Sequence, residues 1–101
     1  MSTILKDQIT FRPLKIEFIG TGEVRGFNFR QIRSTNSCFL YEVDTGSTKH
    51  YEVFKKVINH RFACVSYPRS KSFGVWAWCY KTKSKAEKKF NELIIKNNDE
   101  H

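Results

Sequence analysis

The chain has 101 residues and a formal net charge of +8, and 40% of its residues are hydrophobic and 15% aromatic. These values fit one folded domain with an aromatic core, and they exclude a disordered chain, a repeat array and a multidomain enzyme. The apolar runs are shorter than the ~7–15 residues of a secretory signal or the ~20 of a membrane span, so we expect a cytoplasmic protein without a membrane partner. We place a single basic domain at 11–96 and expect flexible ends at 1–10 and 97–101.

Apolar residues that alternate with polar ones predict four strands in the first half of the chain. The apolar positions are Leu14, Ile16 and Phe18, then Phe27 and Phe29, then Phe39, Tyr41 and Val43, and last Tyr51 and Val53. Glycines and polar residues at 20–22, 34–37 and 44–47 predict the turns between these strands. The stretch 51–62 fits either a long strand or a helical stripe. We favour a strand to about Lys56 and leave a helical turn near 57–61 open.

The segment Asp44-Thr45-Gly46-Ser47 resembles the D-T-G-S string of the aspartic proteases, in which two close carboxylates share a proton. The surrounding residues do not continue the resemblance. Glu42 stands where that family has an apolar residue, and the family's downstream apolar-apolar-Gly strand is missing after residue 60. Since Asp, Thr, Gly and Ser are also common turn residues, we interpret the segment as a hairpin turn in which Asp44 is not catalytic.

Residues 75–80, Val-Trp-Ala-Trp-Cys-Tyr, predict a fifth strand with Trp76, Trp78 and Tyr80 on one face and small side chains on the other. The bulky face either fills the core or forms an exposed platform on which nucleic-acid bases stack. We favour the core for both tryptophans and keep base stacking as the alternative.

A single helix is predicted at the end of the chain. Ser84 and Glu87 have the form of a capping box, which places Ser84 at the N-cap, and the helix is expected to stop at 97–98. Its apolar face consists of Ala86, Phe90, Leu93 and Ile94. The whole pattern predicts an α+β fold, in which a curved antiparallel sheet of about five strands, a meander that is open or partly closed, packs against one C-terminal helix.

The cysteines and histidines are widely spaced, at Cys38, Cys64, Cys79, His50, His60 and His101. An odd number of cysteines without a C-x-x-C pair predicts free, buried thiols in a reducing compartment, not a disulfide framework or a zinc motif. The histidine spacing predicts no metal site. The chain therefore shows no cofactor-binding pattern.

The positive charge is concentrated in one part of the chain. Residues 49–89 contain eleven basic and two acidic residues, a net charge of +9, whereas the remaining residues carry −1. Such asymmetry favours a polyanionic partner. The lysines nearest to the predicted helix start are Lys81, Lys83, Lys85, Lys88 and Lys89. Because a helix N-terminus is already positive, lysines there favour phosphate binding over local stability.

We therefore predict a non-catalytic nucleic-acid-binding domain of low sequence specificity. The expected contact residues are Lys55, Lys56, Arg61, Arg69, Lys71, Trp76, Trp78, Lys81, Lys83, Lys85, Lys88 and Lys89. The alternative is a small phage- or plasmid-type inhibitor that binds an acidic protein surface. The third hypothesis is a small ribonuclease or toxin with a residue set such as His60, Arg61 and Glu52.

Overall fold

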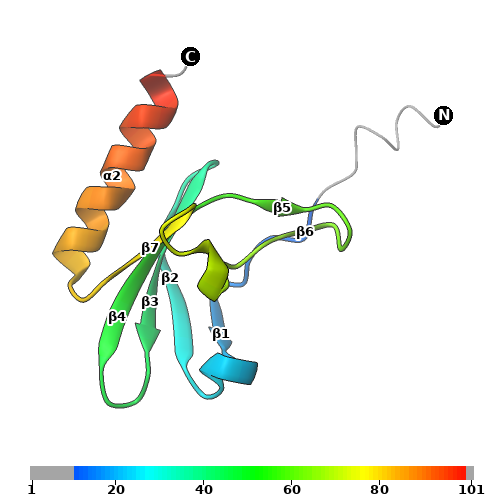
Figure 1. Cartoon of the computed structure of the whole chain (residues 1–101), viewed down its shortest axis with the longest axis vertical. Helices are drawn as coiled ribbons and strands as arrows, with labels where there is room; N and C mark the ends of the chain where they lie inside the picture. Colours follow the sequence, from blue (N-terminus) through cyan, green and yellow to red (C-terminus); the bar gives the residue numbers. More distant parts are fainter. Residues whose placement is uncertain (1–10, 100–101) are drawn as a thin grey trace.

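The computed structural model describes residues 11–99, with side chains as far as Lys96 (Figure 1). The strands are β1 (Glu17–Ile19), β2 (Asn28–Ser34), β3 (Cys38–Asp44), β4 (Lys49–Lys55), β5 (Ile58–Asn59), β6 (Cys64–Val65) and β7 (Ala77–Tyr80), and the helix is α2 (Lys83–Asp99). Five of the strands form one open antiparallel sheet in the order β1-β2-β3-β4-β7, and α2 packs on it. The predicted α+β fold with one C-terminal helix is confirmed.

The two ends of the chain were expected to be flexible. Residues 1–10 and 100–101 lie outside the described residues. The helix continues through the two asparagines at 97–98 to Asp99, so the prediction that it stops there is wrong. Asparagine is only a weak helix breaker, and neither proline nor glycine follows Leu93 to end the helix.

The predicted turn at 44–47 is confirmed as the connection between β3 and β4. The Gly46 N–H donates to Asp44 Oδ1 at 2.9 Å, and the Thr45 N–H donates to the Thr48 carbonyl at 2.9 Å. Gly46 has a φ of +96°, a conformation that glycine adopts without the steric cost of a Cβ atom. Asp44 therefore closes a local turn, as the sequence indicates.

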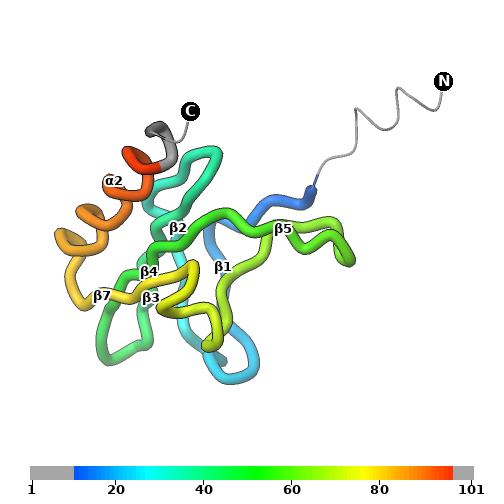
Figure 2. The backbone as a smooth tube through the Cα atoms, turned by 45° about the horizontal axis from the view of Figure 1, so that its top comes forward, coloured from blue at the N-terminus to red at the C-terminus, as the bar shows by residue number. Residues whose placement is uncertain are grey.

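The preferred interpretation of 51–62, a strand to about Lys56, is confirmed by β4, whereas the helical turn near 57–61 is wrong. The strand ends at Lys55, and the chain then forms a separate two-stranded hairpin of β5 and β6 in place of a helical turn. Ala63 has a positive φ of 51°, and Asn59 Oδ1 accepts a hydrogen bond from the Phe62 N–H at 3.1 Å, so this tight turn is closed locally. Figures 1 and 2 show the hairpin projecting from the sheet on the side away from α2.

Each face of the sheet carries its own apolar cluster. Between the sheet and α2, the fully buried side chains include Leu40, Val53, Ala86 and Phe90. This confirms the predicted buried face of the helix. The opposite face carries an aromatic cluster of Phe29, Phe39, Tyr41, Phe54 and Tyr67 with neighbouring apolar residues. The alternation of side chains along β3 and β4 explains why both faces are apolar in the centre of the sheet.

The helix is capped two residues earlier than the sequence indicated. The Ala86 N–H donates to the Thr82 carbonyl, and the Lys85 N–H donates to Thr82 Oγ1 at 3.3 Å. Thr82 is therefore the N-cap, and Ser84 lies inside the first turn. The predicted capping box at Ser84 and Glu87 is wrong, because Thr82 is also a good N-cap residue and its position allows the helix to begin sooner.

The last strand is shorter than expected. β7 begins at Ala77, and the turn before it separates the two tryptophans. Trp78 and Tyr80 pack in the cluster beneath α2, whereas Trp76 packs on the opposite face, with its ring 6.2 Å from that of Phe54. The prediction that all three share one face is wrong, because Trp76 lies in a turn where strand alternation does not hold.

Candidate nucleic-acid interface

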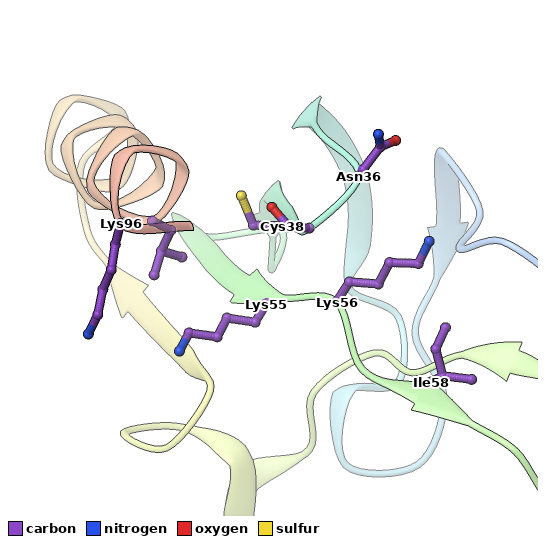
Figure 3. Close-up of a pocket in the computed structure, with 8 residues that line it drawn as sticks. Asn36, Cys38, Lys55, Lys56, Ile58 and Lys96 are labelled. Atoms are coloured by element: carbon purple, nitrogen blue, oxygen red, sulfur yellow. The ribbon is translucent and has the colours of Figure 1, made fainter. Parts of the chain in front are cut away.

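One group of basic residues surrounds a hollow where the end of β4 meets the second half of α2. Lys55 is the last residue of β4 and Lys56 follows it. Lys96 comes from α2, and Asn36 and Ser37 come from the turn between β2 and β3. The hollow has a volume of about 400 Å³. Figure 3 shows Lys55 and Lys96 extending to the same side and Lys56 extending to the other. Ammonium groups beside polar side chains in an open hollow suit an anionic group such as phosphate.

A second group lies at the start of α2. Lys83, Lys85 and Lys88 are exposed, and the first turn of the helix contains no acidic residue. The N-cap residue Thr82 is uncharged as well. Neither the cap nor the first turn of α2 therefore neutralises the positive end of the helix dipole. Because α2 has 17 residues and rises about 1.5 Å per residue, the two lysine groups lie at opposite ends of a helix ~25 Å long.

The other predicted basic residues lie apart from these groups. Arg69 and Lys71 are exposed in and beside the short 3₁₀ turn Ser70–Ser72, and Arg61 lies at the tip of the β5–β6 hairpin with its guanidinium 5.3 Å from the Phe62 ring centre. Lys81 is exposed in the connection between β7 and α2. The predicted residues therefore form several basic areas and not one continuous stripe.

Almost none of this positive charge is used inside the fold. Within residues 11–96, Arg30 forms an ion pair with Glu42, and His50 Nε2 lies within hydrogen-bond distance of Glu52 Oε2. No lysine or arginine between 49 and 89 pairs with an acidic side chain in this part of the structure. All of them are exposed except the half-buried Lys89. Its ammonium lies 4.1 Å from the Trp78 ring centre, a cation–π contact.

The tryptophans do not form an open stacking platform. Trp78 is covered by α2 and by Lys89, and Trp76 is half-buried against Phe54. The preference for core positions is supported for both residues. Base stacking requires an exposed ring face, so the packing of these two tryptophans does not favour the stacking alternative.

Sequence reasoning missed two features. Lys96 was left out because it lies outside the basic segment, and only the packing of α2 brings it beside Lys55. The second feature is a cluster of His50, Glu52 and Cys79, whose ligand atoms all lie within 4.8 Å of one another. The i, i+2 spacing of His50 and Glu52 on one strand face was visible in the sequence, but the position of Cys79 depends on the pairing of β4 with β7.

The residue sets considered for nucleolytic chemistry do not come together. Glu52 accepts a hydrogen bond from the Tyr67 hydroxyl at 2.7 Å and contacts His50, whereas the His60 ring packs edge-on against Phe11 at 5.4 Å between centres. No hydrogen bond joins Cys64 to either histidine in the described part of the chain. The three cysteines are free, but only Cys38 is buried, so the expectation of three buried thiols is wrong.

Burial alters the acid–base behaviour of several groups on the sheet. The pKa of Tyr67 is raised far above its ordinary value, first by burial and then by the negative charge of Glu52. Burial also raises the pKa of the Cys79 thiol, with a further contribution from Glu52. The pKa of Tyr41 is raised by burial, although the hydrogen bond from Gln31 opposes this, and the pKa of Tyr80 is raised by burial and by Glu92. These groups remain protonated at neutral pH.

Comparison with known proteins gives no assignment: no family model matches the chain, and no curated protein or solved structure matches it. Among the described residues, no helix has the length and apolar character needed to cross a membrane.

Proposed function

We propose that this protein is a non-catalytic nucleic-acid-binding domain that contacts phosphates and reads little sequence. One observation carries the proposal. The basic residues of 49–89 are exposed, apart from Lys89, and have no acidic partner within residues 11–96, so their charge is available to a partner. Association with a polyanion releases its condensed counterions, which makes unpaired surface lysines effective contacts.

The contacts expected from this surface are mainly with the sugar-phosphate backbone. Lys55, Lys56 and Lys96 around the hollow offer ammonium groups, and Asn36 adds an amide beside them. Lys83 and Lys85 add positive charge at the uncompensated end of α2. Phosphate contacts position a protein on nucleic acid without specifying sequence, so low specificity follows from the same geometry.

The test is fluorescence anisotropy with three labelled polymers, namely duplex DNA, single-stranded DNA and RNA, over a series of salt concentrations. If about five phosphates are neutralised on duplex DNA, log K falls against log salt with a slope of about −4.5. Two duplexes of scrambled sequence should bind with the same affinity. Absence of binding to all three polymers at low salt contradicts the proposal, and a strong preference for one sequence contradicts low specificity.

The lysines at the start of α2 give a second arm of the test. Replacing Lys83, Lys85 and Lys88 by glutamine should hold or slightly raise the melting temperature, because it removes like charge from the positive end of the helix. The same change should flatten the salt slope by up to about 0.9 for each lost phosphate contact. If the triple variant melts earlier and binds as the parent does, these lysines support the fold and do not contact phosphate.

A second candidate function is binding to the surface of another protein. One observation favours it: Ile16 and Ile19, at the edge strand β1, are 64% and 65% exposed. Exposed apolar side chains beside an unpaired strand edge are typical of a protein contact. Replacing both by serine should leave nucleic-acid affinity unchanged, and a loss of affinity would place the nucleic acid on this edge instead.

A further inference from the structure

We propose that His50, Glu52 and Cys79 form a binding site for a divalent transition metal of the zinc type on the face of the sheet opposite α2. The three ligand atoms lie within 4.8 Å of one another, and His50 Nε2 lies 2.9 Å from Glu52 Oε2. The proposal is independent of nucleic-acid binding, because it uses none of the residues assigned to the phosphate contacts.

The sheet register fixes all three ligands on one surface. Glu52 and Cys79 are directly paired across β4 and β7, so their side chains leave the same face. His50 lies two residues before Glu52 on β4 and therefore also shares that face. Tyr41, the partner of Glu52 on β3, belongs to the aromatic cluster of this face, which confirms that α2 does not cover it.

The distances are close to those of a tetrahedral site. Zinc bonds of about 2.0–2.3 Å to nitrogen, oxygen and sulfur imply ligand–ligand separations of about 3.4–3.6 Å. The His50–Glu52 separation of 2.9 Å is already slightly shorter than this. With all three atoms inside 4.8 Å, rotamer adjustments of about 1 Å bring Cys79 Sγ into the same coordination sphere. Cys79 lies on the edge strand and is exposed, so it is free to make that movement.

The carboxylate is already oriented for this role. Glu52 Oε1 accepts the hydrogen bond from the buried Tyr67 hydroxyl at 2.7 Å, which leaves Oε2 facing His50. A hydrogen bond from a neighbouring side chain to a ligating carboxylate is the usual second layer of a metal site. The side chains of His50 and Glu52 are 24% and 13% exposed, so the site is partly desolvated but can be reached from solvent.

The charge balance also favours a cation. A carboxylate and a thiolate with a neutral imidazole carry two negative charges, which a divalent ion neutralises. A cysteine binds a metal as its thiolate, so binding at this site would release the thiol proton. The donor set of one nitrogen, one oxygen and one sulfur suits zinc and cobalt, and the cluster leaves a fourth position for water.

The test is titration of the full chain, kept reduced, with Co²⁺ followed by displacement with Zn²⁺. We expect one equivalent of Co²⁺ to give the intense visible bands of tetrahedral cobalt together with a thiolate-to-cobalt charge-transfer band, and Zn²⁺ to abolish both. Cys79→Ala should lose the charge-transfer band. Cys64→Ala is the matched control, since it removes a free thiol from the β5–β6 hairpin, and it should bind as the parent does.

Tyr67→Phe tests the orientation of the carboxylate. It should keep the cobalt spectrum but weaken the affinity by about 10–100-fold, the usual effect of losing a second-layer hydrogen bond. Circular dichroism of each variant establishes that it is folded before metal is added. The proposal is overturned if the parent shows no saturable binding at one equivalent, if Cys79→Ala keeps the charge-transfer band, or if Cys64→Ala loses it.

Discussion

The first and second halves of the described chain use their positive charges differently. In the first half, Arg30 pairs with Glu42 at 3.2 Å, and Arg33 lies 4.5 Å from the Phe90 ring centre while it donates to Asn91 Oδ1 at 3.2 Å. In the second half, the lysines of 49–88 are exposed and have no acidic partner within residues 11–96. Two arginines of the first half thus contribute contacts to the fold, whereas the lysines of 49–88 are available to a partner.

The contacts of these charged side chains are expected to contribute less to stability than the apolar core. The Arg30–Glu42 pair is half-exposed on the arginine side, and such a pair contributes only about 0–1 kcal/mol. The packing of Phe90 between the helix and the sheet is fully buried and apolar. Stability should therefore respond strongly to changes at Phe90, weakly to changes at Arg30 and Arg33, and hardly at all to changes at the exposed lysines of 49–88.

The largest effect is expected from Phe90→Ala. This change leaves a cavity between α2 and the sheet and removes the ring on which Arg33 stacks, so unfolding should become easier by about 3–5 kcal/mol in urea titration. Ile95→Ala is the control on the same helix. Ile95 is 60% exposed, so its truncation should change stability by no more than about 0.5 kcal/mol. Equal losses in the two variants would mean that α2 does not pack as described.

A smaller effect is expected at the start of α2. Thr82→Ala removes the side-chain acceptor of the Lys85 N–H and should cost about 0.5–2 kcal/mol. Ser84→Ala lies inside the first turn and should cost less, since serine there forms no cap and alanine is the better helix former. Thermal melting distinguishes the two, and a larger loss for Ser84→Ala would restore Ser84 as the cap.

Arg33 and Arg61 offer the most direct comparison of the two halves. Arg33→Ala should lower stability by about 0.5–1 kcal/mol, because it removes a cation–π contact with the buried Phe90 as well as a hydrogen bond. Arg61→Ala should have no measurable effect on stability, since Phe62 beneath its guanidinium is itself 60% exposed. Chemical denaturation measures both, and an equal loss in the two variants would erase the proposed difference between the halves.

Local patterns in the sequence were sufficient for most of the fold. Alternation predicted the sheet, the 3.6-residue period of Ala86, Phe90 and Leu93 predicted the buried helix face, and turn residues predicted the role of Asp44. Two features lay beyond such patterns because they depend on contacts distant in sequence. The β5–β6 hairpin is joined to Arg12 by backbone hydrogen bonds, and a turn assigns Trp76 and Trp78 to opposite faces.

The candidate sites depend even more on long-range contacts. Lys96 lines the same hollow as Lys55 only because α2 packs across the end of β4. Cys79 meets Glu52 only because β7, 27 residues further along the chain, pairs with β4 in one register. A shift of that register by one residue would turn Cys79 to the other face, so no local spacing rule identifies the cluster.

The assignment of phosphate contacts to the second half of the chain is tested most directly by two triple variants. Both remove the same amount of charge, but from different halves of the chain. Lys55, Lys56 and Lys96 are replaced by glutamine in one, and Arg12, Lys15 and Arg25, exposed residues of the first half, are replaced in the other. The salt dependence of duplex-DNA binding is measured for both. The first variant should lose up to about 2.7 from the magnitude of the salt slope, while the second should keep the slope of the parent. Equal slopes in the two variants would show that net charge alone drives binding and would contradict the assignment of phosphate contacts to the second half.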